Sequence, residues 1–210
     1  MPELLTTATV DQAAASLATG RPVVIAGAHG DLVFAAEDAT PSLLAFTVRH
    51  TDGFVCVALP DETCDYLGLP AMHPGTAHGG ESFAVTVDAA VGGTGISATD
   101  RAHTLRQLAS PTSTPADFTR PGHVVPIRVA ASSTVAGRAE AALDLVRLAG
   151  KSAAAVLCGL VSQRSVGDMA SPEELAAFAE EHSLLVVSAA DVLAPRRAMP
   201  SACPHCGHPA

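Results

Sequence analysis

Two glycine-containing runs of the chain carry residue types that can do chemistry on a small polar molecule. The run 118–128, FTRPGHVVPIR, contains Arg120 and His123, and the run 93–101, GTGISATDR, contains Asp100 and Arg101. An imidazole titrates near neutral pH, so His123 can act as a general acid or base. A guanidinium binds phosphate or carboxylate through paired N–H donors. The two runs therefore indicate acid–base chemistry on an anionic molecule.

Two of these residues also have a purely structural interpretation. His123 can simply cap the end of a strand, and Arg101 can form an ion pair at a helix terminus. The residue types alone leave both interpretations open.

Alternating helical and strand patterns predict the elements that position these runs. Helices are predicted over 10–20, 40–53, 61–69, 98–109, 139–150 and 171–183, and strands over 54–60, 82–90, 124–132 and 154–162, with a strand–turn–strand over 21–37 and a strand and turn over 184–194. Thr40 and Pro41 fit the N-cap and the first position of a helix. No long linker interrupts the pattern, so we expect one α/β (α+β) domain over 1–198 and a flexible tail over 199–210.

The composition excludes two classes of partner. The chain has 12 Lys and Arg against 21 Asp and Glu, a net charge of −9, whereas nucleic-acid binders usually cluster basic residues. No apolar run is long enough to cross a bilayer, and the start of the chain lacks a signal-peptide pattern. We therefore expect a cytoplasmic protein that binds a small molecule. Aromatic residues are only 3%, so the core must be Ala, Val and Leu, and we expect a homodimer.

The two runs, together with other segments, are similar to the signature sequences of the 3,4-dihydroxy-2-butanone 4-phosphate synthase family. The other matching segments are 30–41 (GDLVFAAEDATP), 46–59 (FTVRHTDGFVCVAL), 67–72 (LGLPAM), 83–89 (FAVTVDA), 140–150 (EAALDLVRLAG) and 168–175 (DMASPEEL). The resemblance implies a sandwich of a mixed sheet flanked by helices, assembled as a homodimer. It also implies a lyase of riboflavin biosynthesis that uses magnesium to convert ribulose 5-phosphate into dihydroxybutanone phosphate and formate.

Several positions depart from the family pattern where it carries its chemistry. The family's acidic loop reads IAGAHGD at 25–31, where Asp31 is the surviving acid and His29 replaces a glutamate. Arg138 stands at the position of the metal-binding histidine, and Gly159 at that of the catalytic glutamate. We therefore expect the ancestral magnesium site to be lost, with no metal ligands and no cofactor.

These observations lead to a specific set of candidate residues. We expect His123, Asp31 and Cys56 to carry the chemistry, and Arg101, Arg138, Thr94, Arg120 and His29 to bind the substrate or its anionic group.

The predicted function is that of a repurposed family enzyme. It would do metal-independent proton-transfer or carbon–carbon lyase chemistry on a small polar or anionic substrate. One alternative is a catalytically inactive family member that binds a ligand or a partner protein. A further alternative is an authentic synthase.

The cysteines fall into two groups. Cys56, Cys64 and Cys158 are scattered through the chain, which suits reduced thiols of the core. Cys203 and Cys206 form CPHC, half of a zinc ribbon. A closed zinc site needs four ligands, so we interpret CPHC as part of the flexible tail. The histidines elsewhere lack the tight spacing of a metal site.

Overall fold

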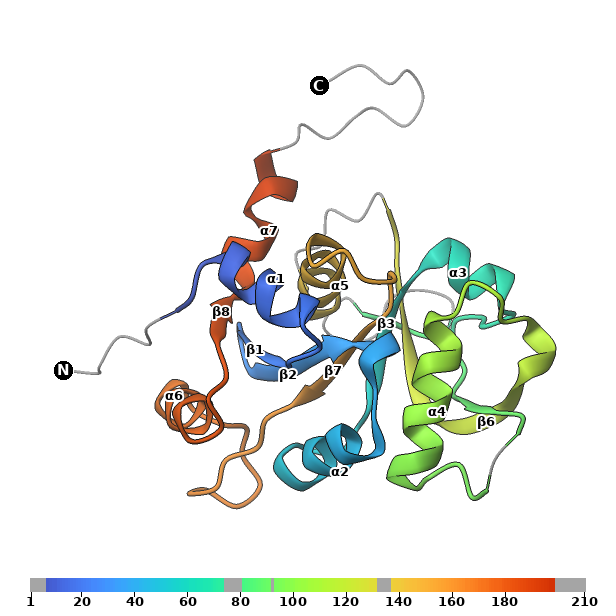
Figure 1. Ribbon diagram of the computed structural model, residues 1–210, viewed down its shortest axis with the longest axis horizontal. Helices are drawn as coiled ribbons and strands as arrows, with labels where there is room; N and C mark the ends of the chain where they lie inside the picture. Colours follow the sequence, from blue (N-terminus) through green and yellow to red (C-terminus); the bar gives the residue numbers. More distant parts are fainter. Residues whose placement is uncertain (1–6, 74–80, 92, 132–136, 199–210) are drawn as a thin grey trace.

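A computed structural model describes residues 7–73, 81–91, 93–131 and 137–198 (Figure 1). The tail at 199–210, with its CPHC motif, lies outside these ranges. In the part of the chain that is described, no helix is both long and apolar enough to cross a membrane.

The centre of the molecule is one mixed, eight-stranded sheet with the strand order β4-β6-β3-β7-β2-β1-β8, in which β5 pairs with β6. β1 pairs with β8 and β3 with β6 in parallel, and the other pairs are antiparallel. The strands are β1 Val23–Ala26, β2 Gly30–Ala35, β3 Cys56–Pro60, β4 Ser82–Phe83, β5 Val87–Ala89, β6 Phe118–Val129, β7 Ala155–Gly159 and β8 Val186–Ser188.

Helices lie on both sides of this sheet, as the resemblance implied. The α-helices are α1 Val10–Ala18, α2 Pro41–His50, α3 Asp61–Tyr66, α4 Ala98–Ala109, α5 Arg138–Leu148, α6 Pro172–Glu181 and α7 Ala189–Ala198, and short 3-10 turns span Ala36–Asp38 and Pro115–Asp117. In Figure 1, α1, α5 and α7 lie above the sheet, and α2 and α6 lie below it. α4 packs against α2 and covers β5 and β6.

Local capping explains where several helices begin. The Thr40 side chain accepts a hydrogen bond from the backbone N–H of Leu43 at 3.1 Å, and Pro41 is the first helical residue. Ser97 and Ser171 cap α4 and α6 in the same way. The predicted cap at Thr40 is confirmed, because the signal lies within four residues of sequence.

The structure corrects three predicted elements. The strand predicted over 82–90 is divided into β4 and β5. Ala84 still donates its N–H to the carbonyl of Pro126 on β6, and the register of the pairing with β6 shifts between Val87 and Asp88. The strand predicted over 124–132 begins at Phe118, since β5 pairs with its first half. Residues 189–194 continue into helix α7 instead of forming a turn. The first two differences involve pairing with strand residues that are distant in sequence.

The core is made of small and medium apolar side chains, as the composition predicted. Helix α5 supplies much of it, with Ala139, Ala141, Ala142, Leu143, Leu145 and Val146 all at most 1% exposed. Alanines on this face let α5 approach the sheet closely. Cys56, Cys64 and Cys158 are free and buried, which confirms that they are core thiols.

Two leucines of α5 give a matched test of this packing. Leu143 is 0% exposed and Leu148 is 59% exposed. Leu143→Ala should lower the free energy of unfolding by about 2–5 kcal/mol, because it leaves a cavity in the core. Leu148→Ala should change it by less than about 0.5 kcal/mol. Urea denaturation of both variants measures the difference, and equal losses would contradict the assigned burial.

A cluster of aromatic rings joins α2 to α6. The ring of Phe46 lies 4.6 Å from His50, 6.0 Å from Phe178 and 5.0 Å from His182, and the two histidine rings are 4.9 Å apart. Burial lowers the pKa of His50, and the charges of His182 and Arg49 lower it further, while Glu181 acts in the opposite direction. The folded chain therefore favours a neutral His50.

This depressed pKa predicts a pH-dependent stability. The unfolded chain binds the proton of His50 more tightly, with a pKa of about 6.5. The stabilisation is therefore complete above about pH 6.5 and is lost as the pH falls below that value. The melting temperature should fall between pH 7.5 and pH 5.5, and less steeply in His50→Phe. Thermal melts of both proteins measure the two slopes, and identical slopes would contradict the assignment.

Candidate active site

A cavity of about 580 Å³ opens where the β1–β2 turn, the start of α5 and the segment before β4 meet. Its lining includes the charged and polar residues His29, Asp31, Asp52, Glu81 and Arg138, together with Ile25, Gly27, Ala28, Gly137, Met169 and Ala189. The volume lies within the range of about 300–1,000 Å³ that small-molecule sites occupy. Three carboxylates and one guanidinium make this a polar, strongly charged site.

Arg138 holds two of these carboxylates together. Its Nη1 donates to Oδ1 of Asp31 at 2.8 Å, and its Nε donates to Oε1 of Glu81 at 2.8 Å. A second bond at 3.3 Å joins Nη2 to Oε2 of Glu81, so this pair is bidentate. The side chain of Asp31 is 4% exposed, against 14% for Glu81 and 35% for Arg138. The ion pairs thus run from the buried sheet outward into the cavity.

Burial and charge act against each other in this cluster. Burial raises the pKa of Asp31, although the nearby guanidinium of Arg138 acts to lower it. Burial acts to lower the pKa of Arg138, but its hydrogen bonds to Glu81 and the charges of Asp31 and Glu81 raise it overall. A buried carboxylate is costly without such a partner, so the ion pair with Arg138 offsets part of the penalty of burying Asp31.

Strand register and glycines set the position of Asp31. It lies between Ile25 of β1 and Gly159 of β7 in the sheet. A Cβ on the preceding Gly30 would lie 2.3 Å from a methyl carbon of Leu175, and a Cβ on Gly159 would lie 2.9 Å from Oδ2 of Asp52. These glycines therefore let α6 and Asp52 approach the floor of the site.

The β1–β2 turn and Asp52 form two further walls. His29 is an exposed residue of that turn and lines the cavity. Oδ1 of Asp52 accepts hydrogen bonds from the backbone N–H of Phe54 at 2.9 Å and from Sγ of Cys158 at 3.1 Å. Asp52 is thus fixed at the end of α2, with its carboxylate facing the cavity.

Cys56 is less prepared for chemistry than predicted. It lies on β3, fully buried, and burial raises the pKa of its thiol to about 12. The thiol is protonated at neutral pH, whereas a nucleophilic cysteine needs its thiolate. The geometry favours a packing role, and catalysis by Cys56 stays a prediction.

His123 forms a separate pair with Asp88. Its Nδ1 lies 2.7 Å from Oδ2 of Asp88, and its backbone N–H donates to Oδ1 at 2.9 Å. The imidazole is 42% exposed and does not line the cavity around Asp31. A carboxylate bonded to one ring nitrogen fixes the tautomer and leaves the other nitrogen for proton transfer. The pair is therefore suited to acid–base chemistry on a ligand brought to this surface.

Glycines make room for this pair. Gly95 has a φ of +77°, and a Cβ there would lie 2.1 Å from Asp88. A Cβ on Gly122 would lie 2.0 Å from the backbone carbonyl carbon of Val87. Only glycine allows β5 and β6 to come this close, which explains the glycine beside His123 in the sequence.

This contact gives a second matched test. Gly122→Ala should destabilise the fold by at least about 1–3 kcal/mol, because backbone atoms must move. The nearest contact of a Cβ on Gly27 is 3.6 Å, so Gly27→Ala should change the stability by less than about 0.5 kcal/mol. Urea denaturation compares them, and a neutral Gly122→Ala would overturn the close approach of β5 and β6.

The remaining predicted anion-binding residues have partners within the chain. The Arg120 guanidinium donates to the carbonyls of Leu67, Gly68, Pro115 and Phe118. Arg101 is 7% exposed, and its Nη1 donates to the carbonyl of Gly53 at 3.4 Å. Thr94 donates to Asp100 at 3.3 Å beside a smaller cavity of about 160 Å³ near Asp88. The structure thus brings Asp31, His29 and Arg138 to one cavity. The other polar candidates lie outside its lining: His123, Arg101, Arg120 and Thr94.

Sequence reasoning missed three carboxylates, Glu81, Asp52 and Asp88. Asp52 follows a helix end and Asp88 lies in a strand-like run, positions that usually indicate a turn or a solvated face. Glu81 comes directly after residues 74–80, which lie outside the described ranges. Each of the three lies far in sequence from the side chain that it contacts, so no local pattern of the sequence identifies it.

Comparison with known proteins decides the family. The family model described as 3,4-dihydroxy-2-butanone 4-phosphate synthase matches residues 11–194. The chain belongs to this family. It is 50% identical over 197 residues to the riboflavin biosynthesis protein RibBA of Mycolicibacterium gilvum, and 48% identical over 203 residues to RibBA of Salinispora arenicola. These alignments cover 90% and 92% of the chain but 47% and 48% of the relatives, so the chain spans about half their length.

Solved structures of synthases share the fold. The 3,4-dihydroxy-2-butanone 4-phosphate synthase of Candida albicans superposes with a TM-score of 0.83 at 34% identity, covering 90% of this chain and 98% of that one. A synthase in complex with two magnesium ions superposes at 0.81 with 34% identity, covering 90% and 97%. The predicted sandwich of a mixed sheet flanked by helices is confirmed.

These comparisons overturn two predictions. The expected repurposed enzyme is wrong, because relatives about half identical to this chain are named as riboflavin biosynthesis proteins. The expected absence of a cofactor, with a lost magnesium site, is also wrong, because a synthase of the same fold holds two magnesium ions. Both predictions gave too much weight to single substituted positions.

The cavity of this chain suits a hard cation. Asp31 and Glu81 already converge on a cationic group, the guanidinium of Arg138. Their oxygens are ligands that magnesium prefers, and it is often held by one or two carboxylates plus substrate oxygens. Within the ranges described, no cluster of three or more His, Cys, Asp or Glu is close enough to hold a metal. The fit therefore rests on the two carboxylates.

Proposed function

We propose that this chain is a 3,4-dihydroxy-2-butanone 4-phosphate synthase that converts ribulose 5-phosphate into that product and formate. The observation that carries the proposal is identity of about one half to RibBA proteins over nine-tenths of the chain. The structural match to synthases supports it. The proposal concerns the part of the relatives that this chain covers.

The cavity offers the groups that such a reaction uses. A magnesium ion held by Asp31 and Glu81 would polarise the carbonyl and hydroxyl oxygens of the sugar, which makes the neighbouring C–H more acidic. His29, an exposed residue of the cavity lining, would bind the polar end of the substrate.

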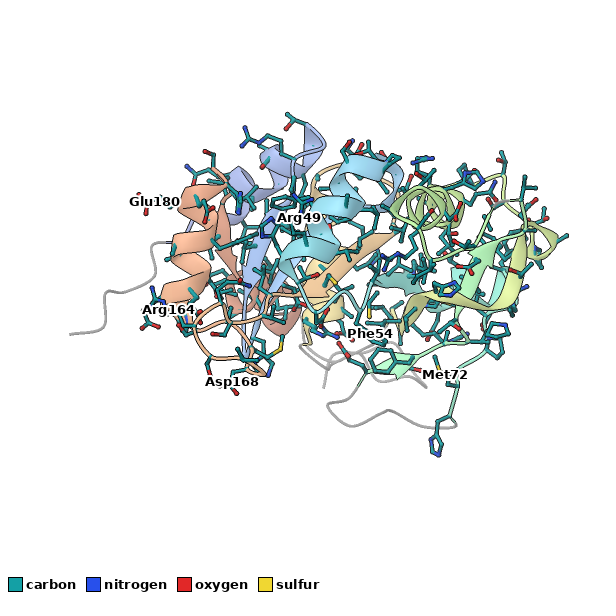
Figure 2. The ribbon with its side chains drawn as sticks, turned by 90° about the horizontal axis from the view of Figure 1, so that it is seen from below. Arg49, Phe54, Met72, Arg164, Asp168 and Glu180 are labelled. Atoms are coloured by element: carbon teal, nitrogen blue, oxygen red, sulfur yellow. The ribbon has the colours of Figure 1, made fainter. Side chains whose placement is uncertain are left out.

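His123 has a distinct place in the proposal. It retains an exposed imidazole bonded to Asp88 but does not line the cavity of its own chain. We propose that the protein is a homodimer, in which a second copy can bring such a pair to a cavity. Phe54 and Met72 support an apolar contact, being 50% and 55% exposed. They lie on one side of the molecule and both adjoin Phe83 (Figure 2).

The predicted cytoplasmic location stays a prediction.

Formate release tests the proposed reaction. The purified chain should convert ¹³C-labelled ribulose 5-phosphate to formate in the presence of Mg²⁺, and chelation with EDTA should stop it. Asp31→Asn should lower the turnover at least about 100-fold, because it removes one of the two carboxylates that would hold the magnesium ion. Asp11→Asn, on the exposed face of α1, is the control and should leave the rate unchanged. NMR follows the products.

Two outcomes would overturn the proposal. One is that the folded wild-type chain yields no formate at saturating sugar phosphate and Mg²⁺. The other is that Asp31→Asn turns over at the wild-type rate.

A further inference from the structure

The guanidinium of Arg138 already binds the two carboxylates that would hold a magnesium ion. Asp31 and Glu81 each bond to Arg138 at 2.8 Å. These bonds, with a third at 3.3 Å, occupy Oδ1 of Asp31 and both carboxylate oxygens of Glu81. The cavity therefore contains a counter-ion that belongs to the chain.

We propose that Arg138 competes with the divalent cation for Asp31 and Glu81 and thereby sets the cation affinity of the site. The inference rests on the proposed function, since it takes this cavity as the magnesium site. Cation binding in this chain is then an exchange, in which the guanidinium leaves the carboxylates as the metal ion arrives.

The two sides of the exchange differ in mobility. Asp31 is fixed on β2, which is paired on both sides, and its side chain is 4% exposed. Arg138 is the first residue of α5, and its side chain is 35% exposed. A long, flexible side chain at a helix start can swing into the cavity without disturbing the sheet. The arginine is therefore the partner that moves.

Charge makes the two occupants mutually exclusive. The carboxylates carry two negative charges and the guanidinium offsets one of them, whereas a divalent ion offsets both. A guanidinium and a divalent ion within a few ångströms of each other repel strongly in a partly buried site. Mg²⁺ binding must therefore work against the ion pairs of Arg138, and its affinity is lower than the carboxylates alone would give.

Cation titration without substrate tests the exchange. Mn²⁺ binding, followed by electron paramagnetic resonance, should be at least about tenfold tighter in Arg138→Met than in the wild-type chain. Methionine keeps much of the side chain's length but removes the charge. Arg138→Lys, which keeps the charge, should bind Mn²⁺ close to the wild-type affinity. Equal or weaker binding by Arg138→Met, or binding by neither protein, would overturn the proposal.

A second measurement uses the wild-type chain, because Arg138→Met leaves a buried carboxylate unpaired and can fail to fold. In ¹⁵N NMR, the Nε–H signal of Arg138 should shift during a Mg²⁺ titration, while that of Arg120, held by backbone carbonyls, should not. Mg²⁺ binding with an unmoved Arg138 signal would overturn the exchange.

The two proposals fail in different ways. Formate release with an unmoved Arg138 signal removes the exchange and keeps the synthase. Tighter Mn²⁺ binding by Arg138→Met without formate release from the wild-type chain removes the synthase and keeps the exchange.

Discussion

The buried carboxylate of Asp31 is the constraint on which the site depends. It lies on a central strand with its side chain 4% exposed, and a charge in that position needs a partner of opposite sign. Arg138 supplies this partner from the start of α5 and also ties Glu81 to the site. One ion-pair cluster thus connects the sheet, the helix and the segment before β4. The cavity keeps its shape because these three elements share it.

A second pair, His123 and Asp88, depends on backbone geometry instead of charge balance. β5 and β6 approach so closely that a Cβ on Gly122 would overlap the backbone of Val87. This contact brings Asp88 within 2.7 Å of the imidazole. The two polar centres are therefore built differently: the cavity is organised by ion pairs, and the histidine pair by glycine-permitted strand packing. Both are placed by the same sheet.

Substitutions at single positions of the family's motifs are weaker evidence for a changed function than similarity along the whole chain. The acidic loop with His29, Arg138 and Gly159 depart from the family pattern, and these departures suggested a repurposed enzyme without metal. Relatives about half identical to the chain overturn this interpretation. The structure gives a physical reason why single positions are a weak guide to a lost site. Two carboxylates from other segments, Glu81 and Asp52, line the same cavity as Asp31. Ligands that converge in space need not occupy the positions that a linear motif assigns to them.

The sequence by itself determined the family and the mixed sheet flanked by helices, because whole segments resemble the family's signature sequences. It also determined the cap at Thr40 and the Ala, Val and Leu core, because these depend on local spacing and composition. It also singled out Asp31, His29 and Arg138, which the fold brings to one cavity. Only the tertiary structure decided that Glu81 joins them, that Asp88 partners His123 and that Arg120 is held by carbonyls. These contacts join residues far apart in the chain, and no periodicity encodes which distant side chains meet.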